Sequence, residues 1–97
     1  MMTFEELREL LIEVITEIQA GSGRPVPEFH DELCPIGDLE GFDSLNGLEV
    51  SCELSKHLDR DIKPDLMVPD HPWGQLTINE IVGRLQQIVG AQGERLT

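Results

Sequence analysis

The first predicted element is an amphipathic helix. Apolar side chains recur every three or four residues from Phe4 to Ile18, and glutamates occupy the positions between them. This spacing is typical of a helix with one face in a core. Thr3 and Glu6 have the spacing of a capping box, and the Gly- and Pro-containing run 21–27 stops the pattern. We therefore predict a helix over residues 3–20.

A long connection, residues 21–43, follows this helix. Structureless loops of such length are uncommon in compact domains. Four of its apolar residues come at every third position, and these are Leu33, Ile36, Leu39 and Phe42. We expect the connection to pack onto the helices and to include a short helical turn, which Pro35 and Gly37 keep from growing longer.

The second long helix, predicted over residues 44–58, carries two apolar stripes. One stripe is Leu45, Leu48 and Cys52, and the other is Val50, Leu54 and Leu58. At about 100° per residue the two stripes lie on different sides, so one can face the core while the other stays exposed. The expected polar neighbours of the exposed stripe are Glu49, Glu53 and Asn46.

The remaining sequence, residues 59–97, predicts one more long helix. Three prolines between residues 59 and 76 limit that stretch to a short helix, which we place between 63 and 76. Thr77 and Glu80 form a second capping box and open a helix over 77–89, with a frayed tail from Gly90 onward. No strand-like alternation occurs. The prediction is an all-α bundle in a single domain, 1–97, with its core at about 3–89.

Charge narrows the choice of partners. The 97 residues contain 19 Asp and Glu against 7 Lys and Arg, a net charge of -12. Such a surface repels nucleic acids and anionic membranes and complements a basic patch on another protein, unless the acidity serves solubility alone. Two cysteines are too few for a disulfide framework. Without a signal-peptide pattern or a membrane-length apolar run, we expect a cytoplasmic monomer.

Ser44 stands between Asp43 and Leu45 at the start of the second long helix. The simplest interpretation is a helix cap, because serine and aspartate are both favoured there. A hydrolase nucleophile is a poor alternative, since GFDSL is not a G-x-S-x-G elbow and no strand precedes it. The histidines and cysteines show no metal-ligand spacing, so we predict no metal site.

The run Asp43-Ser44-Leu45, between a long loop and an acidic helix, resembles the attachment site of acyl carrier proteins. The resemblance spans about residues 4–89 and is weakest over 63–76. Its further residues are Ile36, Leu39, Phe42, Glu49, Leu54, Leu58, Asp61 and Ile62. It implies that Ser44 carries 4'-phosphopantetheine through a phosphodiester, and that the thiol of this arm holds acyl groups as thioesters. A phosphate there would meet free N–H groups and the positive end of the helix dipole.

The resemblance also implies partners. The protein would catalyse nothing itself; a phosphopantetheinyl transferase would modify it, and it would serve acyl-transferring and condensing enzymes of a fatty acid, polyketide or specialised lipid pathway. Asp43 would help the transferase and its metal ion engage Ser44, unless it is only a cap. Basic docking patches on the enzymes would meet Leu45, Leu48 and Cys52, ringed by Glu49 and Glu53; Leu48 could instead be core. The alternative function is an acidic helical adaptor in which Ser44 only caps the helix.

The chain departs from the family in three places. Lys56 and His57 stand where acidic residues are common, so partner choice is expected to differ. Gly47 weakens the helix by about 1 kcal/mol relative to alanine; it either admits a close approach by a partner or the arm, or is tolerated. We place Trp73 in the core at the rim of the bundle, with the acyl cavity as the alternative.

Overall fold

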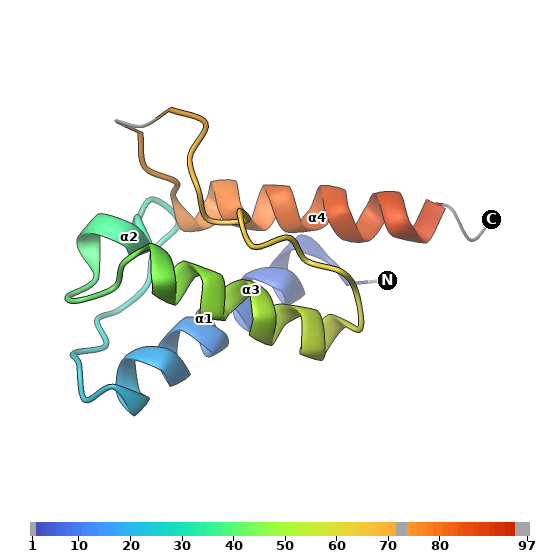
Figure 1. Ribbon diagram of the computed structural model, residues 1–97. Coiled ribbons are helices and arrows are strands. Elements are labelled where there is room, and N and C mark those ends of the chain that lie inside the picture. Colours follow the sequence, from blue (N-terminus) through green and yellow to red (C-terminus); the bar gives the residue numbers. More distant parts are fainter. Residues whose placement is uncertain (1, 72–73, 95–97) are drawn as a thin grey trace.

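The structure, a computed structural model, describes residues 2–71 and 74–94, with side chains up to residue 90. In these ranges the chain forms four helices, α1 (Phe4–Gly21), α2 (Pro35–Asp38), α3 (Ser44–Leu58) and α4 (Ile78–Glu94) (Figure 1). No strand occurs among the described residues, so the predicted all-α class is confirmed. No helix in these ranges is both long and apolar enough to cross a membrane.

Helix α1 is the centre of the packing. It contacts both α3 and α4, and the apolar stripe predicted from its sequence is buried. The core is built mainly from leucine, isoleucine and valine, as the shortage of aromatic residues requires. Its fully buried apolar side chains include Leu7, Leu11, Val14, Ile15, Val50, Leu54, Ile78, Ile81, Val82 and Leu85.

The long first connection packs onto this core, as predicted. Leu33, Leu39 and Phe42 are all buried. The carbonyl oxygen of Leu33 accepts a hydrogen bond from the N–H of Ile78 (2.8 Å), so the connection also satisfies an amide in the first turn of α4. The predicted helical turn is α2, where Gly37 has a φ of 122° that prevents a regular helix.

Two elements differ from prediction. Helix α4 continues to Glu94, past the predicted end at residue 89. The short helix expected between 63 and 76 is absent from the described part of that stretch, where residues 64–67 make only a turn. Pro64 and Pro69 lack the N–H groups that a helix there would need. Trp73, expected at the rim of the core, lies outside the described residues.

Both predicted capping boxes are present. At α1 the Thr3 N–H donates to the Glu6 carboxylate (2.9 Å) and the Glu6 N–H donates to Oγ1 of Thr3 (3.2 Å). At α4 the corresponding distances between Thr77 and Glu80 are 3.0 and 3.1 Å. In each box the backbone N–H of the threonine, followed by its side-chain hydroxyl, lowers the pKa of the glutamate.

These pKa shifts predict how stability responds to acid. Each folded-state pKa lies below the ordinary value of 4.5. The ionised carboxylates therefore stabilise the fold above that pH, and this contribution disappears as the pH falls through the folded pKa. Glutamine keeps the box without titrating. Melting curves recorded from neutral pH down to about pH 3 are expected to show a smaller acid-induced fall in melting temperature in the variant Glu6→Gln/Glu80→Gln than in the wild type. Parallel losses in the two proteins would contradict this.

Candidate functional site

Helix α3 is capped by Asp43 and not by Ser44. Oδ1 of Asp43 accepts hydrogen bonds from the N–H groups of Leu45 (3.0 Å) and Asn46 (3.2 Å). Ser44 is the first helical residue and is exposed. Its hydroxyl makes no hydrogen bond to any residue that the structure describes. The interpretation of Ser44 as a cap is therefore wrong, and the cap role considered for Asp43 is confirmed.

The Asp43 cap changes what a phosphate on Ser44 would meet. The N–H groups of Leu45 and Asn46, expected to be free, are already bonded to Oδ1 of Asp43. The positive end of the helix dipole remains available to an anion. Oδ2 of Asp43 accepts no hydrogen bond within the described ranges, so it can face a cation.

A partly buried polar network holds the backbone that leads into Ser44. Nη1 of Arg24 donates to Oε1 of Gln19 (3.1 Å), to the carbonyl oxygen of Gly41 (2.6 Å) and to Oδ1 of Asn46 (3.3 Å). Nε2 of Gln19, a residue with no exposed surface, donates to the carbonyl oxygen of Glu40 (3.0 Å). The network therefore joins the end of α1, the 39–43 loop and the first turn of α3.

Asn46 belongs to this network and does not flank the exposed stripe as predicted. It is buried, and its Oδ1 accepts the N–H of Asp43 (3.1 Å), which completes a capping box at α3. Its Nδ2 donates to Oε1 of Glu49 (3.1 Å). Gly41 is required beside it: its φ is 70°, and a Cβ there would lie 2.8 Å from Cδ of Arg24.

An apolar cavity of about 230 Å³ opens beside Ser44. Its walls come from α2, α3, α4 and the segments between α3 and α4, and mostly carry hydrocarbon. The lining residues are Ile36, Ser44, Met67, Val68, Pro69, Gly74, Gln75, Leu76 and Ile81. The Ser44 side chain is thus exposed to solvent and also borders an apolar space.

The two predicted stripes of α3 separate as expected. Val50 and Leu54 are fully buried, whereas Leu45 is 68% exposed and Leu48 is 41% exposed. Leu48 is therefore not a core residue. Cys52 is exposed as well. We call Leu45, Leu48 and Cys52 the exposed strip.

Acidic side chains accompany the exposed strip. Glu49 is exposed, and half-buried Glu53 forms an ion pair with Lys56 (3.2 Å). Gly47 is buried on the other side of α3. A Cβ there would lie 3.4 Å from Ile36 and from Met67. The groups that approach Gly47 closely are therefore these two side chains of the same chain, where a partner or the arm was expected.

Ser44 also differs from the other serines. Ser51 and Ser55 donate hydrogen bonds to the carbonyl oxygens of Gly47 (3.3 Å) and Ser51 (3.0 Å). Ser22 is exposed but follows α1, at the negative end of that helix dipole. Within the described ranges, no three His, Cys, Asp or Glu side chains are placed to hold a metal ion.

Comparisons of the chain with protein-family models, with curated proteins and with solved structures find no match. The evidence for function therefore comes from the residues and geometry of the chain itself.

Proposed function

We propose that the protein is an acyl carrier protein that bears a 4'-phosphopantetheine arm on Ser44. The observation that carries this proposal is the state of the Ser44 hydroxyl. It is exposed and unbonded in the described structure, stands at the positive end of the α3 dipole, and borders an apolar cavity. The adjoining Asp43 supplies the cap, which leaves Ser44 free for modification.

The modification needs little from the carrier. The Ser44 oxygen attacks the phosphorus of coenzyme A that bears pantetheine, and the pyrophosphate bond from this phosphorus to adenosine bisphosphate breaks. Adenosine bisphosphate leaves, and the hydroxyl proton passes to a base of the phosphopantetheinyl transferase. The unbonded Oδ2 of Asp43 is available to the metal ion of the transferase. The arm then tethers its acyl cargo, which raises the effective concentration of the cargo at each partner enzyme.

The cavity beside Ser44 suits an aliphatic cargo. Met67, Leu76 and Ile81 supply hydrocarbon walls. Each methylene group that moves from water into such a space stabilises the bound chain by about 0.8 kcal/mol. A cavity of about 230 Å³ shelters part of a chain and so protects an apolar thioester between enzymes.

The exposed strip is the proposed docking surface for acyl-transferring and condensing enzymes. Leu45 and Leu48 offer apolar contacts, and Glu49 and Glu53 attract basic patches. The same observation favours the second candidate, an unmodified acidic adaptor that uses this strip to bind a partner. The two functions differ in one property: only the carrier accepts phosphopantetheine.

An intact-mass measurement tests the proposal. The purified chain is incubated with a phosphopantetheinyl transferase and coenzyme A and is expected to gain the mass of one phosphopantetheine group. The variant Ser22→Ala, which removes the other exposed serine, is expected to gain the same mass. No gain with several transferases would favour the adaptor.

Charge reversal on the exposed strip tests the proposed docking surface. Reversing the charge with Glu49→Lys or Glu53→Lys is expected to weaken turnover by an acyl-transferring enzyme by about 1 kcal/mol per site, because a basic patch loses its complement. The effect is expected to shrink as ionic strength rises. Glu9→Lys and Glu13→Lys, on the exposed face of α1, change net charge equally and serve as controls. Equal losses from both pairs would show that net charge, and not this surface, matters.

A further inference from the structure

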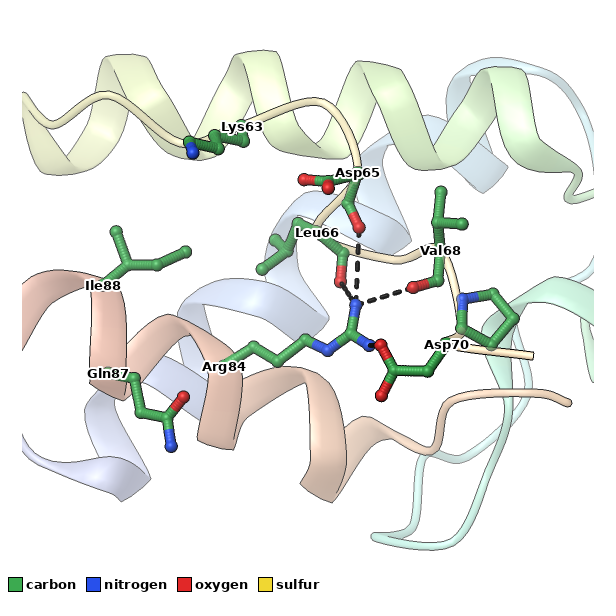
Figure 2. Close-up of a pocket in the computed structure, with 9 residues that line it drawn as sticks. Lys63, Asp65, Leu66, Val68, Asp70, Arg84, Gln87 and Ile88 are labelled. Atoms are coloured by element: carbon green, nitrogen blue, oxygen red, sulfur yellow. Dashed lines mark hydrogen bonds and ion pairs between the residues drawn. The ribbon is translucent and has the colours of Figure 1, made fainter.

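A non-helical segment lies between α3 and α4, and we call its residues 63–70 the strap (Figures 1 and 2). Two backbone hydrogen bonds shape it, from Leu66 N–H to Lys63 O (3.2 Å) and from Val68 N–H to Asp65 O (3.0 Å). The strap packs closely on α3, because a Cβ at Gly47 would lie 3.4 Å from Cβ of Met67. An open groove of about 560 Å³ separates it from part of α4.

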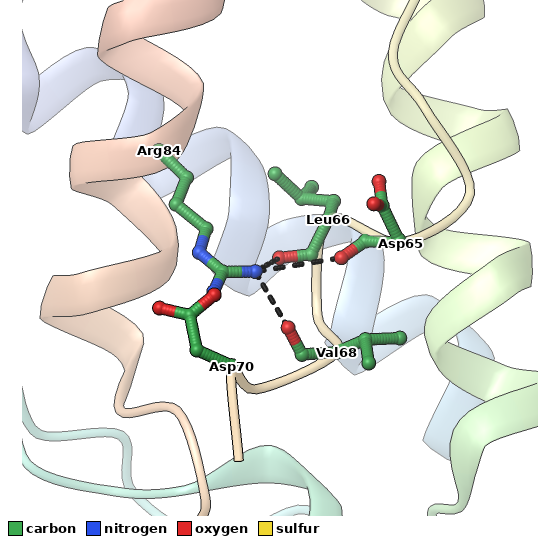
Figure 3. A network of polar contacts seen from close by, with 5 residues as sticks. All are labelled: Asp65, Leu66, Val68, Asp70 and Arg84. Atoms are coloured by element: carbon green, nitrogen blue, oxygen red, sulfur yellow. Dashed lines mark hydrogen bonds and ion pairs between the residues drawn. The ribbon is translucent and has the colours of Figure 1, made fainter.

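Arg84 of α4 reaches across this groove and holds the strap. Its Nη1 donates to the carbonyl oxygens of Asp65 (3.4 Å), Leu66 (3.1 Å) and Val68 (2.7 Å). Its Nη2 donates to Oδ1 of Asp70 (3.1 Å), so the guanidinium group contacts the strap at several points from Asp65 to Asp70 (Figure 3). A planar guanidinium with several fixed donors suits such a set of acceptors, whereas an ammonium group acts as a point charge.

The strap is also a wall of the cavity beside Ser44. Met67, Val68 and Pro69 line that cavity, and Arg84 bonds the backbone immediately before Met67 and the carbonyl group of Val68. Arg84 therefore contacts the strap within this wall and directly beside it. Among the described residues, the other walls come from Ile36 of the irregular helix α2, from Ser44 of α3, from Ile81 of α4 and from the 74–76 segment.

We propose that Arg84 is a specificity-determining residue, which sets the shape of the cavity beside Ser44 by holding the strap and so decides how well an aliphatic chain on Ser44 is sheltered. This inference rests on the proposed carrier function. With Arg84 in place the wall is preformed, and a chain enters without having to order it. Without Arg84 only part of the population has the wall closed, and the apparent affinity for the chain falls to that fraction of its original value.

The chain offers a matched control in Arg8. Arg8 of α1 also holds a loop, through an ion pair with Asp31 (2.7 Å), and its side chain is 23% exposed against 27% for Arg84. Neither residue of that pair lines the cavity. Comparing Arg84→Gln with Arg8→Gln therefore separates the effect on the cavity from the general effect of losing an arginine.

The first measurement is amide hydrogen exchange, which needs no cargo. Exchange of the Leu66 and Val68 amides is expected to rise about tenfold in Arg84→Gln, which is the size of effect that the loss of a charged hydrogen bond gives. The same amides are expected to exchange at the original rate in Arg8→Gln. Unchanged exchange in Arg84→Gln would overturn the proposal, because the strap would then be held by other contacts.

The second measurement attaches a chain without a transferase. The thiol of Ser44→Cys attacks an alkyl methanethiosulfonate, forms a disulfide to the alkylthio group and releases methanesulfinate. Exposed Cys52 would compete for the reagent, while burial, followed by the carboxylates of Asp38 and Glu80, raises the pKa of the Cys34 thiol and slows its reaction. Both native cysteines are therefore replaced by serine in every protein compared.

The readout is the difference in melting temperature between octyl-labelled and ethyl-labelled protein. We expect octyl to stabilise the parent more than ethyl does, Arg84→Gln to lose at least half of this difference, and Arg8→Gln to keep it. Arg84→Lys, which retains the charge, is expected to lie between the parent and Arg84→Gln. An equal octyl-minus-ethyl difference in Arg84→Gln and Arg8→Gln would overturn the proposal, as would no difference in the parent. Failure of the carrier function itself would appear separately, as the absence of transferase-dependent mass gain.

Discussion

Ser44→Ala is expected to abolish phosphopantetheine attachment completely while changing the free energy of unfolding by less than about 0.5 kcal/mol. Modification disappears because the accepting oxygen is gone. Stability is retained because the Ser44 hydroxyl is exposed and bonds to no described residue, and alanine is a favourable helical residue. Intact mass after incubation with transferase and coenzyme A measures the first effect, and urea unfolding measures the second.

Asp43→Ala is the matched control, because it changes the adjacent residue and removes the actual cap. It takes away the acceptor of the Leu45 and Asn46 N–H groups and is expected to cost about 1–2 kcal/mol. If Ser44→Ala destabilised the protein as much as Asp43→Ala, the hydroxyl would have a structural role, and the claim that Asp43 alone stabilises the start of α3 would be wrong.

Arg24→Ala is expected to cause the largest loss of stability, about 2–4 kcal/mol. It leaves Oε1 of Gln19 and the carbonyl oxygen of Gly41 without their donor, and it removes one of the donors to Oδ1 of Asn46. Gln19 and Asn46 are both buried, so water replaces the guanidinium group less readily at these two side chains than at exposed Gly41. Chemical unfolding of the variant, monitored by circular dichroism, gives the measurement.

Arg8→Ala provides the comparison for this prediction. Its ion pair with Asp31 lies at the surface, where the Asp31 side chain is 61% exposed, and is expected to contribute about 1 kcal/mol or less. Losses of equal size in the two variants would mean that the Arg24 network contributes no more to stability than a surface ion pair.

Arg24→Ala is also expected to slow modification of Ser44 under conditions where the variant is still folded, because the network positions the loop before α3.

Local sequence patterns predicted the long helices well, for physical reasons that are themselves local. The threonine–glutamate pairs at residues 3 and 6 and at residues 77 and 80 are directly visible as capping boxes, and helix α3 has the predicted bounds, 44–58. The cap at α3 was harder to assign because Asp43 and Ser44 are both good N-caps. The partner of Asp43 in its capping box is Asn46, in place of the usual glutamate or glutamine.

The loop contacts of the candidate site could not be predicted in this way. Arg24 and Arg84 donate hydrogen bonds to backbone carbonyl groups far away in the sequence. Every residue has a backbone carbonyl group, so the amino-acid sequence does not show which of them accept. The described walls of the cavity beside Ser44 come from α2, α3, the strap, the 74–76 segment and α4, so no single stretch of the sequence encodes the cavity. One signal was available: Gln19 continues the buried stripe of α1, and a polar residue at such a position indicates a buried hydrogen-bond partner.

The most direct test of the carrier function is peptide-resolved mass spectrometry of the full chain after incubation with a phosphopantetheinyl transferase and coenzyme A. The predicted result is one phosphopantetheine group per chain, located on Ser44, in the wild type and in Ser22→Ala, and none in Ser44→Ala. Folded protein that gains no mass with several transferases, or that carries the group on a residue other than Ser44, would contradict the account.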